Sequence, residues 1–147
     1  MIYLGADHRG HALKKYLLRF LEKQLKREAV DLGAIDYDDQ DDFVDFAVLV
    51  AKKVAAEPGS FGILLCGNGQ GMCMAANKIK GARAMLGHSI ESAEFTRRED
   101  DANIICLPAR TMSDEHATAI VKTFLETEFS REEKRVRRLD KLKALEK

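Results

Sequence analysis

The residues with the clearest chemical potential lie at positions 66–71, where a cysteine is followed by alternating glycines in the sequence CGNGQG. Alternate glycines allow backbone N–H groups to converge at the start of a helix, where the helix dipole adds partial positive charge. Such a turn can bind an anion. Cys66 stands beside it, and we expect its thiol to lose a proton more easily than a free cysteine. The thiol is therefore a candidate nucleophile or general base.

Candidate ligand-binding side chains follow two other apolar runs of the sequence. Asp7 and His8 come directly after the first run, and Arg110 follows the run at 103–107. Farther along, Arg131 and Arg135 would lie one helical turn apart and could bind one phosphate together, although a solvated charged face is the commoner explanation of such a pair. These residues indicate a site for an anionic ligand.

These candidates need elements that bring them to one place, and the sequence alternates between apolar runs and amphipathic stretches. Strands are predicted at 1–6, 29–32, 61–66, 82–86 and 103–107, and helices at 11–27, 43–56, 72–79, 89–99, 114–127 and 131–145. Such alternation is typical of a doubly wound, three-layer α/β/α sandwich, here Rossmann-like with a five-stranded parallel sheet. Ligands bind outside the carboxyl ends of such strands, so the candidates after the first, third and fifth strands should meet at one edge.

The last predicted helix differs from the others. Its apolar residues form a narrow stripe that is too thin for a core: Val136, Leu139, Leu142 and Leu145. Residues 131–147 include eight basic and four acidic residues, whereas 31–51 include seven aspartates and no basic residue. We expect the helix to contact a second subunit, and the acidic segment 36–42 to be a solvated loop.

Composition favours a single domain over residues 1–147 and excludes several classes of protein. Basic and acidic residues both number 24, which gives no argument for a nucleic-acid partner or a membrane. Neither a signal-peptide pattern nor an apolar run of membrane-spanning length occurs in the sequence. The three cysteines match neither a zinc site nor a disulfide framework, so we expect a reducing cytoplasm, with Cys73 and Cys106 as inert thiols.

A nucleotide cofactor is the main alternative for a strand followed by a glycine turn. In this chain Met72 occupies the place where the third glycine of G-x-G-x-x-G would fall, and the strand is third in the chain rather than first. The Gly-Lys-Ser/Thr of a phosphate-binding loop does not occur either. We therefore expect neither NAD nor FAD, and no other cofactor or metal.

Five segments of the chain resemble a family of sugar-phosphate isomerases that contains ribose-5-phosphate isomerase B and the two galactose-6-phosphate isomerase subunits. They are GADHRG at 5–10, DFVDFA at 42–47, CGNGQGMCMAANK at 66–78, DDAN at 100–103 and the region of Arg110. The likeness covers nearly the whole chain. Its central motif, a cysteine-glycine turn that runs into AANK, is quite specific to that family.

The resemblance implies a metal-independent aldose-ketose isomerisation, of which ribose 5-phosphate to ribulose 5-phosphate is the first candidate. Cys66 would move a proton between C1 and C2 through a cis-enediolate, and Asp7 would hold sugar hydroxyls. The enediolate oxygen would be bound by the turn: Gly67, Asn68, Gly69, Gln70 and Gly71. The phosphate would be bound by basic residues: His8, Arg110, Arg131 and Arg135. The family also implies a homodimer, or a tetramer, in which the C-terminal arginines reach the other subunit's site.

Several positions depart from the usual pattern of the ribose enzyme. Asn68 replaces a threonine, and its amide can still donate a hydrogen bond during catalysis. Glu99 occupies the position of a histidine that opens the sugar ring, and Asp100 that of a substrate-binding asparagine. A carboxylate at position 99 can transfer a proton if its pKa is raised, so it stays a catalytic candidate. A glycine-rich run before the last helix is missing, so Arg135 aligns more safely than Arg131.

These departures keep other functions open. One alternative is an isomerase of galactose 6-phosphate or of another hexose or pentose phosphate. Others are an isomerase of unphosphorylated sugars and a silent subunit that binds a sugar phosphate in a mixed oligomer. Hydrogen exchange at C1 or C2 separates a catalyst from a binding subunit, and a comparison of each phosphorylated sugar with its free form tests the need for phosphate.

Overall fold

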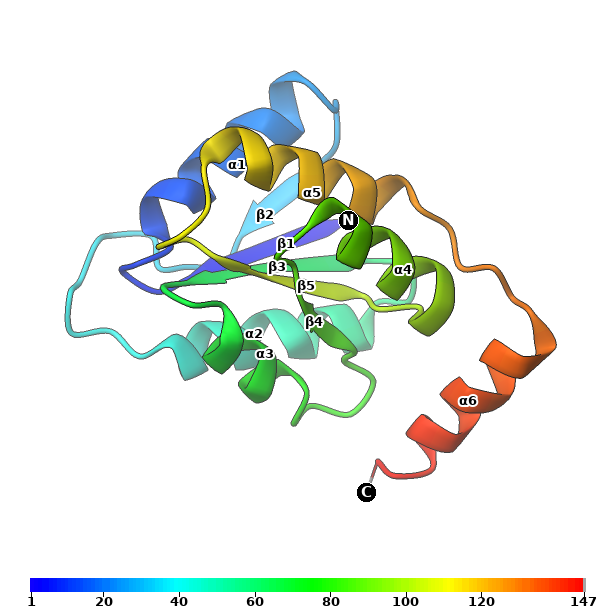
Figure 1. Cartoon of the computed structure of the whole chain (residues 1–147). Coiled ribbons are helices and arrows are strands. Elements are labelled where there is room, and N and C mark those ends of the chain that lie inside the picture. Colours follow the sequence, from blue (N-terminus) through cyan, green and yellow to red (C-terminus); the bar gives the residue numbers. More distant parts are fainter. Residues whose placement is uncertain (147) are drawn as a thin grey trace.

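A computed structural model describes residues 1–146 and shows a central sheet with helices on both faces (Figure 1). The sheet contains five parallel strands in the order β2-β1-β3-β5-β4. The strands are β1 Ile2–Ala6, β2 Ala29–Asp31, β3 Phe61–Cys66, β4 Ala84–Leu86 and β5 Ile104–Pro108. The helices are α1 His11–Lys23, α2 Phe43–Ala56, α3 Gln70–Ala76, α4 Ile90–Asp100, α5 Asp114–Glu126 and α6 Glu133–Lys143. The predicted α/β fold with a parallel sheet is confirmed.

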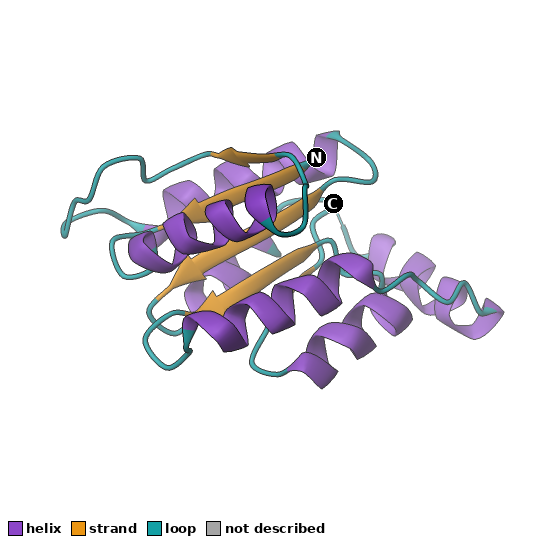
Figure 2. Cartoon of the chain, turned by 90° about the horizontal axis from the view of Figure 1, so that it is seen from above, coloured by secondary structure: helices purple, strands orange, loops and turns teal. Residues whose placement is uncertain are grey.

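The two faces of the sheet carry separate apolar cores, because successive residues of a strand point to opposite faces. On one face Ile63 and Leu65 pack with residues of α1, α4 and α5. On the other face Leu64 and Cys66 pack with residues of α2 and α3. Figures 1 and 2 show the resulting three layers. In the described part of the chain, no helix has the length and apolar character that a membrane crossing requires.

The loop between β2 and α2 is held against the first turns of α1. Lys14 is fully buried, and its Nζ donates to the Asp31 carboxylate over 2.6 Å and also to the carbonyl oxygen of Ala34. His11 Nε2 lies 3.1 Å from the carbonyl oxygen of Ile35. These contacts direct the acidic segment that follows toward the carboxyl end of β1.

Two helix ends differ from the prediction for reasons that lie in the backbone. α1 ends at Lys23 rather than at residue 27, and Lys26 beyond it has a left-handed φ of 53° that no helix can continue. α3 begins at Gln70, two residues earlier than predicted, because Gly69 takes a left-handed φ of 74° at its start. The turn is therefore tighter than the sequence pattern indicates.

The C-terminal helix α6 lies apart from the sheet (Figure 1) and is shorter than predicted. Arg131 precedes it with a left-handed φ of 56°, so the prediction that Arg131 and Arg135 share a helical face is wrong. The prediction that its apolar stripe stays outside a core is wrong for Leu139, which is buried. The other stripe residues are exposed: Val136, Leu142 and Leu145. Lys147, the last residue of the predicted interface segment, lies outside the described residues.

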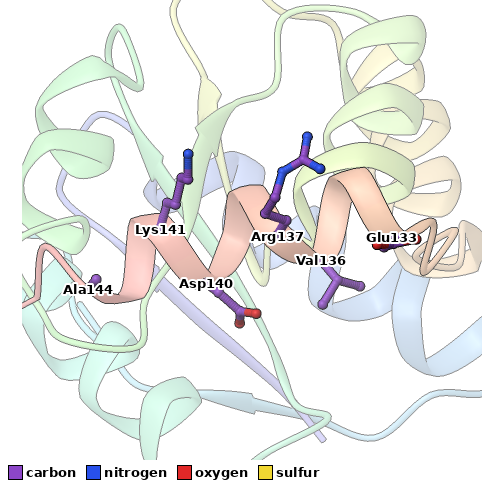
Figure 3. Close-up of a pocket in the computed structure, with 6 residues that line it drawn as sticks. All are labelled: Glu133, Val136, Arg137, Asp140, Lys141 and Ala144. Atoms are coloured by element: carbon purple, nitrogen blue, oxygen red, sulfur yellow. The ribbon is translucent and has the colours of Figure 1, made fainter.

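A hollow of about 560 Å³ adjoins α6, and the residues around it belong to this helix or, in the case of Ala144, directly follow it (Figure 3). They are Glu133, Val136, Arg137, Asp140, Lys141 and Ala144. None of the candidate catalytic residues lies there. This hollow is therefore a property of the helix surface and not the site that the sequence predicts.

Candidate functional site

The carboxyl ends of β1, β3 and β5 bring one group of candidate residues together. Asp7 directly follows β1, Cys66 ends β3, and Arg110 lies two residues beyond β5. Backbone hydrogen bonds tie these segments to one another: the Asp7 N–H donates to the Leu65 carbonyl over 3.2 Å, and the Arg110 N–H donates to the Gly67 carbonyl over 3.0 Å. The structure thus places these candidates at one sheet edge, as the alternation of elements predicts.

Cys66 sits at the base of this edge with 6% of its surface exposed. Its Sγ accepts a hydrogen bond from the Gly69 N–H over 3.2 Å. A side chain at position 69 would stand 3.0 Å from the backbone carbon of Leu107, and the backbone there has a positive φ. Only glycine adopts this backbone conformation without strain. The conformation directs the Gly69 N–H toward the Cys66 sulfur.

The ionisation of the Cys66 thiol differs from the expectation. Burial raises the pKa of the thiol, and the charge of Asp7 raises it further, while the backbone N–H groups of Met72, Gly69 and Asn68 lower it. The raising effects win, so the prediction of an easily ionised thiol is wrong. The physical reason is that burial removes water from the thiolate, and this destabilises the charged form more than the aligned N–H groups stabilise it.

Two residues of the glycine turn face the solvent. Asn68 and Gln70 have exposed side chains, so both amides are accessible to a ligand. Gly67 and Gly71 leave room for neighbouring side chains: a Cβ on Gly67 would meet Arg110 Nη2 at 3.3 Å, and one on Gly71 would meet the Phe43 ring at 2.8 Å. The glycines therefore permit close packing of side chains from other loops against the turn.

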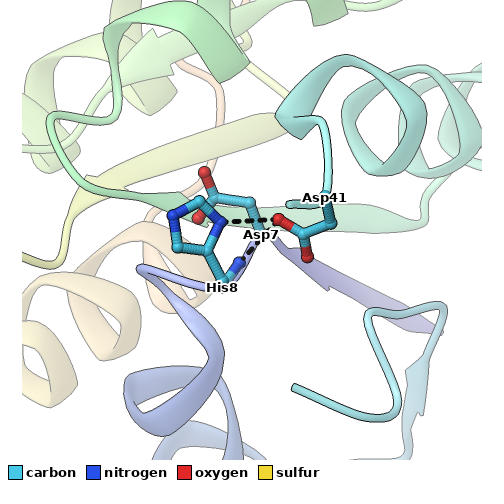
Figure 4. A group of neighbouring side chains, drawn as sticks. All are labelled: Asp7, His8 and Asp41. Atoms are coloured by element: carbon cyan, nitrogen blue, oxygen red, sulfur yellow. Dashed lines mark hydrogen bonds and ion pairs between the residues drawn. The ribbon is translucent and has the colours of Figure 1, made fainter. Parts of the chain in front are cut away.

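His8 is held by Asp41, a residue of the acidic loop that we predicted to be solvated (Figure 4). One oxygen of Asp41, Oδ1, accepts the backbone N–H of His8 over 3.0 Å and lies 2.7 Å from His8 Nδ1. A carboxylate can only accept, so Nδ1 carries the hydrogen and Nε2 is left for a ligand. The Asp7 carboxylate accepts the backbone N–H groups of Arg9 and Gly10 at 2.9 and 3.1 Å.

Burial raises the pKa of Asp7, the charge of Asp41 adds to this, and the two backbone bonds and His8 oppose it. Asp7, His8 and Asp41 offer oxygen and nitrogen atoms within 4.8 Å of one another, as a metal site would. However, Asp41 Oδ1 already accepts two N–H groups, one of them from His8. The arrangement is that of a hydrogen-bonded pair, in which the second carboxylate oxygen of Asp41, Oδ2, is buried without a hydrogen-bond partner.

A cavity of about 440 Å³ adjoins this pair, and three of its five lining residues are basic or imidazole side chains: His8, Arg9 and Arg110, with Tyr37 and Asp39. Sequence reasoning missed Arg9, although it follows His8 in the same motif. It also missed Asp41, for which no local signal exists. An anion is the ligand that this lining suits.

The other candidates lie at the opposite edge of the sheet. β3 and β5 pair in register from Gly62 with Ile104 to Cys66 with Pro108, so the start of β5 is roughly 13 Å from Cys66 along the strand. Glu99 and Asp100 end the helix just before that start. The structure does not bring them to the Cys66 of their own chain.

Arg131 and Arg135 belong to the same amino-terminal edge. Arg131 lines a cavity with residues at the start of β3, and Arg135 Nη1 lies 3.2 Å from Glu99 Oε1. Arg135 Nε lies 3.1 Å from Glu132 Oε1, and neither Nε nor Nη1 is aligned for a hydrogen bond, although both are buried. Burial and the neighbouring Glu99 raise the pKa of Asp100, while Arg135 and Arg138 lower it. The predicted site residues thus form two groups at opposite edges of one chain.

Comparison with known proteins identifies a family that matches this chain over most of its length. The family model described as Ribose/Galactose Isomerase matches residues 2–142. Ribose-5-phosphate isomerase B of Mycobacterium tuberculosis H37Rv is 40% identical over 146 residues, which cover 99% of this chain and 90% of the relative.

Solved structures agree with this match. Ribose-5-phosphate isomerase B from Mycoplasma genitalium with bound ribulose-5-phosphate superposes with a TM-score of 0.91 at 41% identity, covering 97% of this chain and 93% of that one. The type B ribose 5-phosphate isomerase of Trypanosoma cruzi gives a TM-score of 0.93 at 39% identity, with 99% and 97% covered. This chain therefore belongs to the ribose/galactose isomerase family.

Proposed function

We propose that this chain interconverts ribose 5-phosphate and ribulose 5-phosphate, with Cys66 as the base that moves a proton between C1 and C2. The observation that carries the proposal is the position of the Cys66 sulfur under a turn of backbone N–H groups, next to a cavity lined by His8 and Arg110. A base, a set of oxyanion donors and a phosphate-compatible cavity are the parts that this reaction needs.

The reaction follows from these parts in two proton transfers. The thiolate of Cys66 takes the proton from C2 of the aldose, and the electron pair forms the C1–C2 double bond while O1 becomes an oxyanion. Backbone N–H groups of the turn from Gly67 to Gly71 stabilise that oxyanion, since they are already oriented before charge develops. Return of the proton to C1, with transfer of the O2 hydroxyl proton to O1, leaves the ketose carbonyl at C2.

Asp7 and the exposed amides of Asn68 and Gln70 are proposed to hold the sugar hydroxyls, and His8 and Arg110 the phosphate. Two N–H donors fix the Asp7 carboxylate, so its remaining oxygen has a defined position for a hydroxyl. His8 has Nε2 free because Nδ1 is bonded to Asp41, and Nε2 donates to a phosphate oxygen when the ring carries its second proton. Both arrangements support binding without rearrangement of the carboxyl edge.

We also propose that a second copy of the chain completes the site. Glu99, Asp100, Arg131 and Arg135 stand at the edge opposite Cys66, so they can act on the sugar or its phosphate only in another chain's site. A two-fold dimer that places the amino-terminal edge of one chain over the carboxyl edge of its partner creates two equal sites. The unaligned N–H groups of Arg135 and the exposed stripe of α6 support such a contact. A tetramer of two such dimers is compatible with it.

A cytoplasmic location forms part of the proposal. The relatives are named as isomerases of a phosphorylated sugar, and all three cysteines of this chain are free thiols. Free thiols persist in a reducing compartment.

Hydrogen exchange in deuterated water tests the proposed function. The protein is mixed with ribose 5-phosphate, ribulose 5-phosphate, galactose 6-phosphate and free ribose, and deuterium at C1 and C2 is followed by NMR. We expect exchange and turnover with the two pentose phosphates, and loss of both in Cys66→Ser. Cys73→Ser, which changes a thiol on α3 outside the turn, is the matched control.

The outcomes separate the alternatives. Exchange with galactose 6-phosphate alone would assign the chain to a hexose phosphate, and exchange with free ribose would remove the need for phosphate. Binding of ribose 5-phosphate without exchange would leave a silent subunit. Full activity of Cys66→Ser would overturn the role of the sulfur.

A further inference from the structure

Arg9 is a basic residue of the carboxyl edge to which the proposed function assigns no role. It lies between His8 and Gly10, the residue before α1, and its side chain is exposed. Its Cδ stands 3.2 Å from the place that a Cβ on Gly67 would occupy, and Arg110 Nη2 stands 3.3 Å from the same place. Two arginine side chains therefore cross the glycine turn next to each other.

The charges around Arg9 do not neutralise it. In residues 1–146, neither Arg9 nor Arg110 has a carboxylate within ion-pair distance. Asp41 is bonded to His8, and Asp7 accepts backbone N–H groups. Asp39 lines the same cavity, but its carboxylate accepts the side-chain amide of Gln40. Two unpaired guanidinium groups this close together repel each other unless an anion lies between or beside them.

The backbone that carries Arg9 is held in place. Its N–H donates to Asp7 Oδ1 over 2.9 Å, and the N–H of Gly10 donates to the same oxygen over 3.1 Å. The helix that follows has no side-chain cap and no acidic residue in its first turn, so its partial positive charge adds to that of the arginines. The side chain of Arg9 thus starts from a fixed point and needs only rotation to reach an anion in the cavity.

We propose that Arg9 is a phosphate-binding residue supplied by the same chain as Cys66, which acts with His8 and Arg110 and sets the preference for phosphorylated sugars. The inference rests on the proposed function and deepens it. Two guanidinium groups and the His8 imidazole of a single chain then surround the phosphate, and the arginines of a second copy add to this set. A planar guanidinium can form hydrogen bonds to two phosphate oxygens at once. A sugar without a phosphate has no such pair of charged oxygens.

The test uses Arg9→Met, which keeps the aliphatic stem over Gly67 and removes the charge, and Arg9→Lys, which restores a positive charge. Arg19→Met, an exposed change on the following helix α1, is the matched control. Calorimetry measures the Kd of inorganic phosphate, and steady-state assays measure kcat and KM for ribose 5-phosphate. Thermal unfolding checks that each variant is folded.

We expect Arg9→Met to raise the Kd of phosphate and the KM of ribose 5-phosphate about 10- to 100-fold, the loss of one charge-assisted hydrogen bond, with a smaller change in kcat. Arg9→Lys should recover part of this loss, and Arg19→Met should behave as the wild type. An Arg9→Met protein with wild-type affinity for phosphate would overturn the proposal. If Arg9→Met does not fold, wild-type phosphate affinity of Arg9→Gln overturns it instead.

The failure of the proposed function gives a different result. In that case the wild-type protein turns over no sugar phosphate, yet the phosphate titration still decides the role of Arg9. A wild-type protein that isomerises ribose 5-phosphate while Arg9→Met keeps the same KM would leave the function standing and refute the role of Arg9.

Discussion

At the residue scale, Asp41 determines how His8 meets its ligand. A single carboxylate oxygen accepts both the backbone N–H and the Nδ1–H of His8, and the two side chains are 8% and 21% exposed. Replacement of Asp41 by alanine removes that acceptor and frees the ring. Because a hydrogen bond to a charged group contributes about 1.5–3 kcal/mol, we expect the KM for ribose 5-phosphate to rise about tenfold or more, with a smaller change in kcat.

Two further variants make this prediction specific. Asp41→Asn keeps an acceptor oxygen without the charge, so its KM should lie between those of the wild type and Asp41→Ala. Asp36→Asn changes an exposed carboxylate of the same loop and should leave KM unaltered. An unchanged KM in Asp41→Ala would show that His8 is positioned by other contacts.

The raised pKa of Cys66 gives a second prediction at this scale. Burial raises the pKa of the thiol above its ordinary value, so the free protein at neutral pH holds the neutral thiol. The thiolate fraction grows as pH rises toward that pKa, and kcat/KM should therefore increase from neutral into alkaline solution. A pH profile of kcat/KM for ribose 5-phosphate checks this. A flat profile, or one that falls on the alkaline side, would count against Cys66 as the base.

The site residues differ in how far they could be predicted. Asp7, Cys66 and Arg110 lie at the carboxyl ends of strands or within two residues of them, and parallel strands bring these ends to one edge of the sheet, so the sequence pattern is sufficient for them. Asp41 is 33 residues from His8, and their contact depends on the path of a loop without periodicity. The pKa of Cys66 could not be predicted, because burial and N–H donation act in opposite directions.

At the scale of elements, Lys14 joins α1 to β2 and to the loop that carries Asp41. Its side chain is fully buried, whereas the side chain of its partner Asp31 is 26% exposed. Lys14→Met removes the ammonium donor from the Ala34 carbonyl and from the Asp31 carboxylate, which keeps the backbone N–H of Gly33. We expect the free energy of unfolding to fall by about 3 kcal/mol. This is the low end of the loss found when one partner of a buried ion pair is removed, because water still reaches Asp31.

Urea unfolding followed by circular dichroism measures this loss. Lys15→Met, the exposed neighbour on the same helix, is the control and should shift the midpoint by little. Equal midpoints for the two variants would mean that the buried ion pair contributes no more than a surface lysine.

The elements themselves were largely predictable, and their ends were not. Alternation of apolar runs with amphipathic stretches identified every strand and helix, because both periodicities are local properties of the sequence. Left-handed backbone at Gly69 and Arg131 set the starts of α3 and α6, and such conformations are decided by a few torsion angles. The position of Glu99 was missed, although a helix between two parallel strands must end at their amino-terminal edge.

At the scale of the whole molecule, the two edges of the sheet carry complementary chemistry. The base, the N–H donors and the cation-lined cavity lie at the carboxyl edge, and Glu99, Asp100 and Arg135 lie at the amino-terminal edge. No rotation of side chains closes a gap of roughly 13 Å along a strand, because the sheet between them is rigid. If both groups act on one sugar phosphate, each active site must draw on two chains.

Mixed dimers provide the corresponding prediction. Cys66→Ser disables the carboxyl edge and Arg135→Ala the amino-terminal edge, so each homodimer has two impaired sites. In a mixed dimer one site receives both defects and the other receives neither. Denaturation and joint refolding of the two variants should therefore restore activity toward ribose 5-phosphate at one site of each mixed dimer.

The matched control pairs Cys66→Ser with His8→Ala, two changes at the same edge. A mixed dimer of these chains carries one defect in each site, so no activity should return. All three variants share the same refolding and assembly steps. Recovery of activity in the first pair and not in the second therefore requires that the carboxyl edge of one chain meets the amino-terminal edge of the other. Recovery in neither pair, with dimers seen by sedimentation, would place Arg135 outside the partner's site.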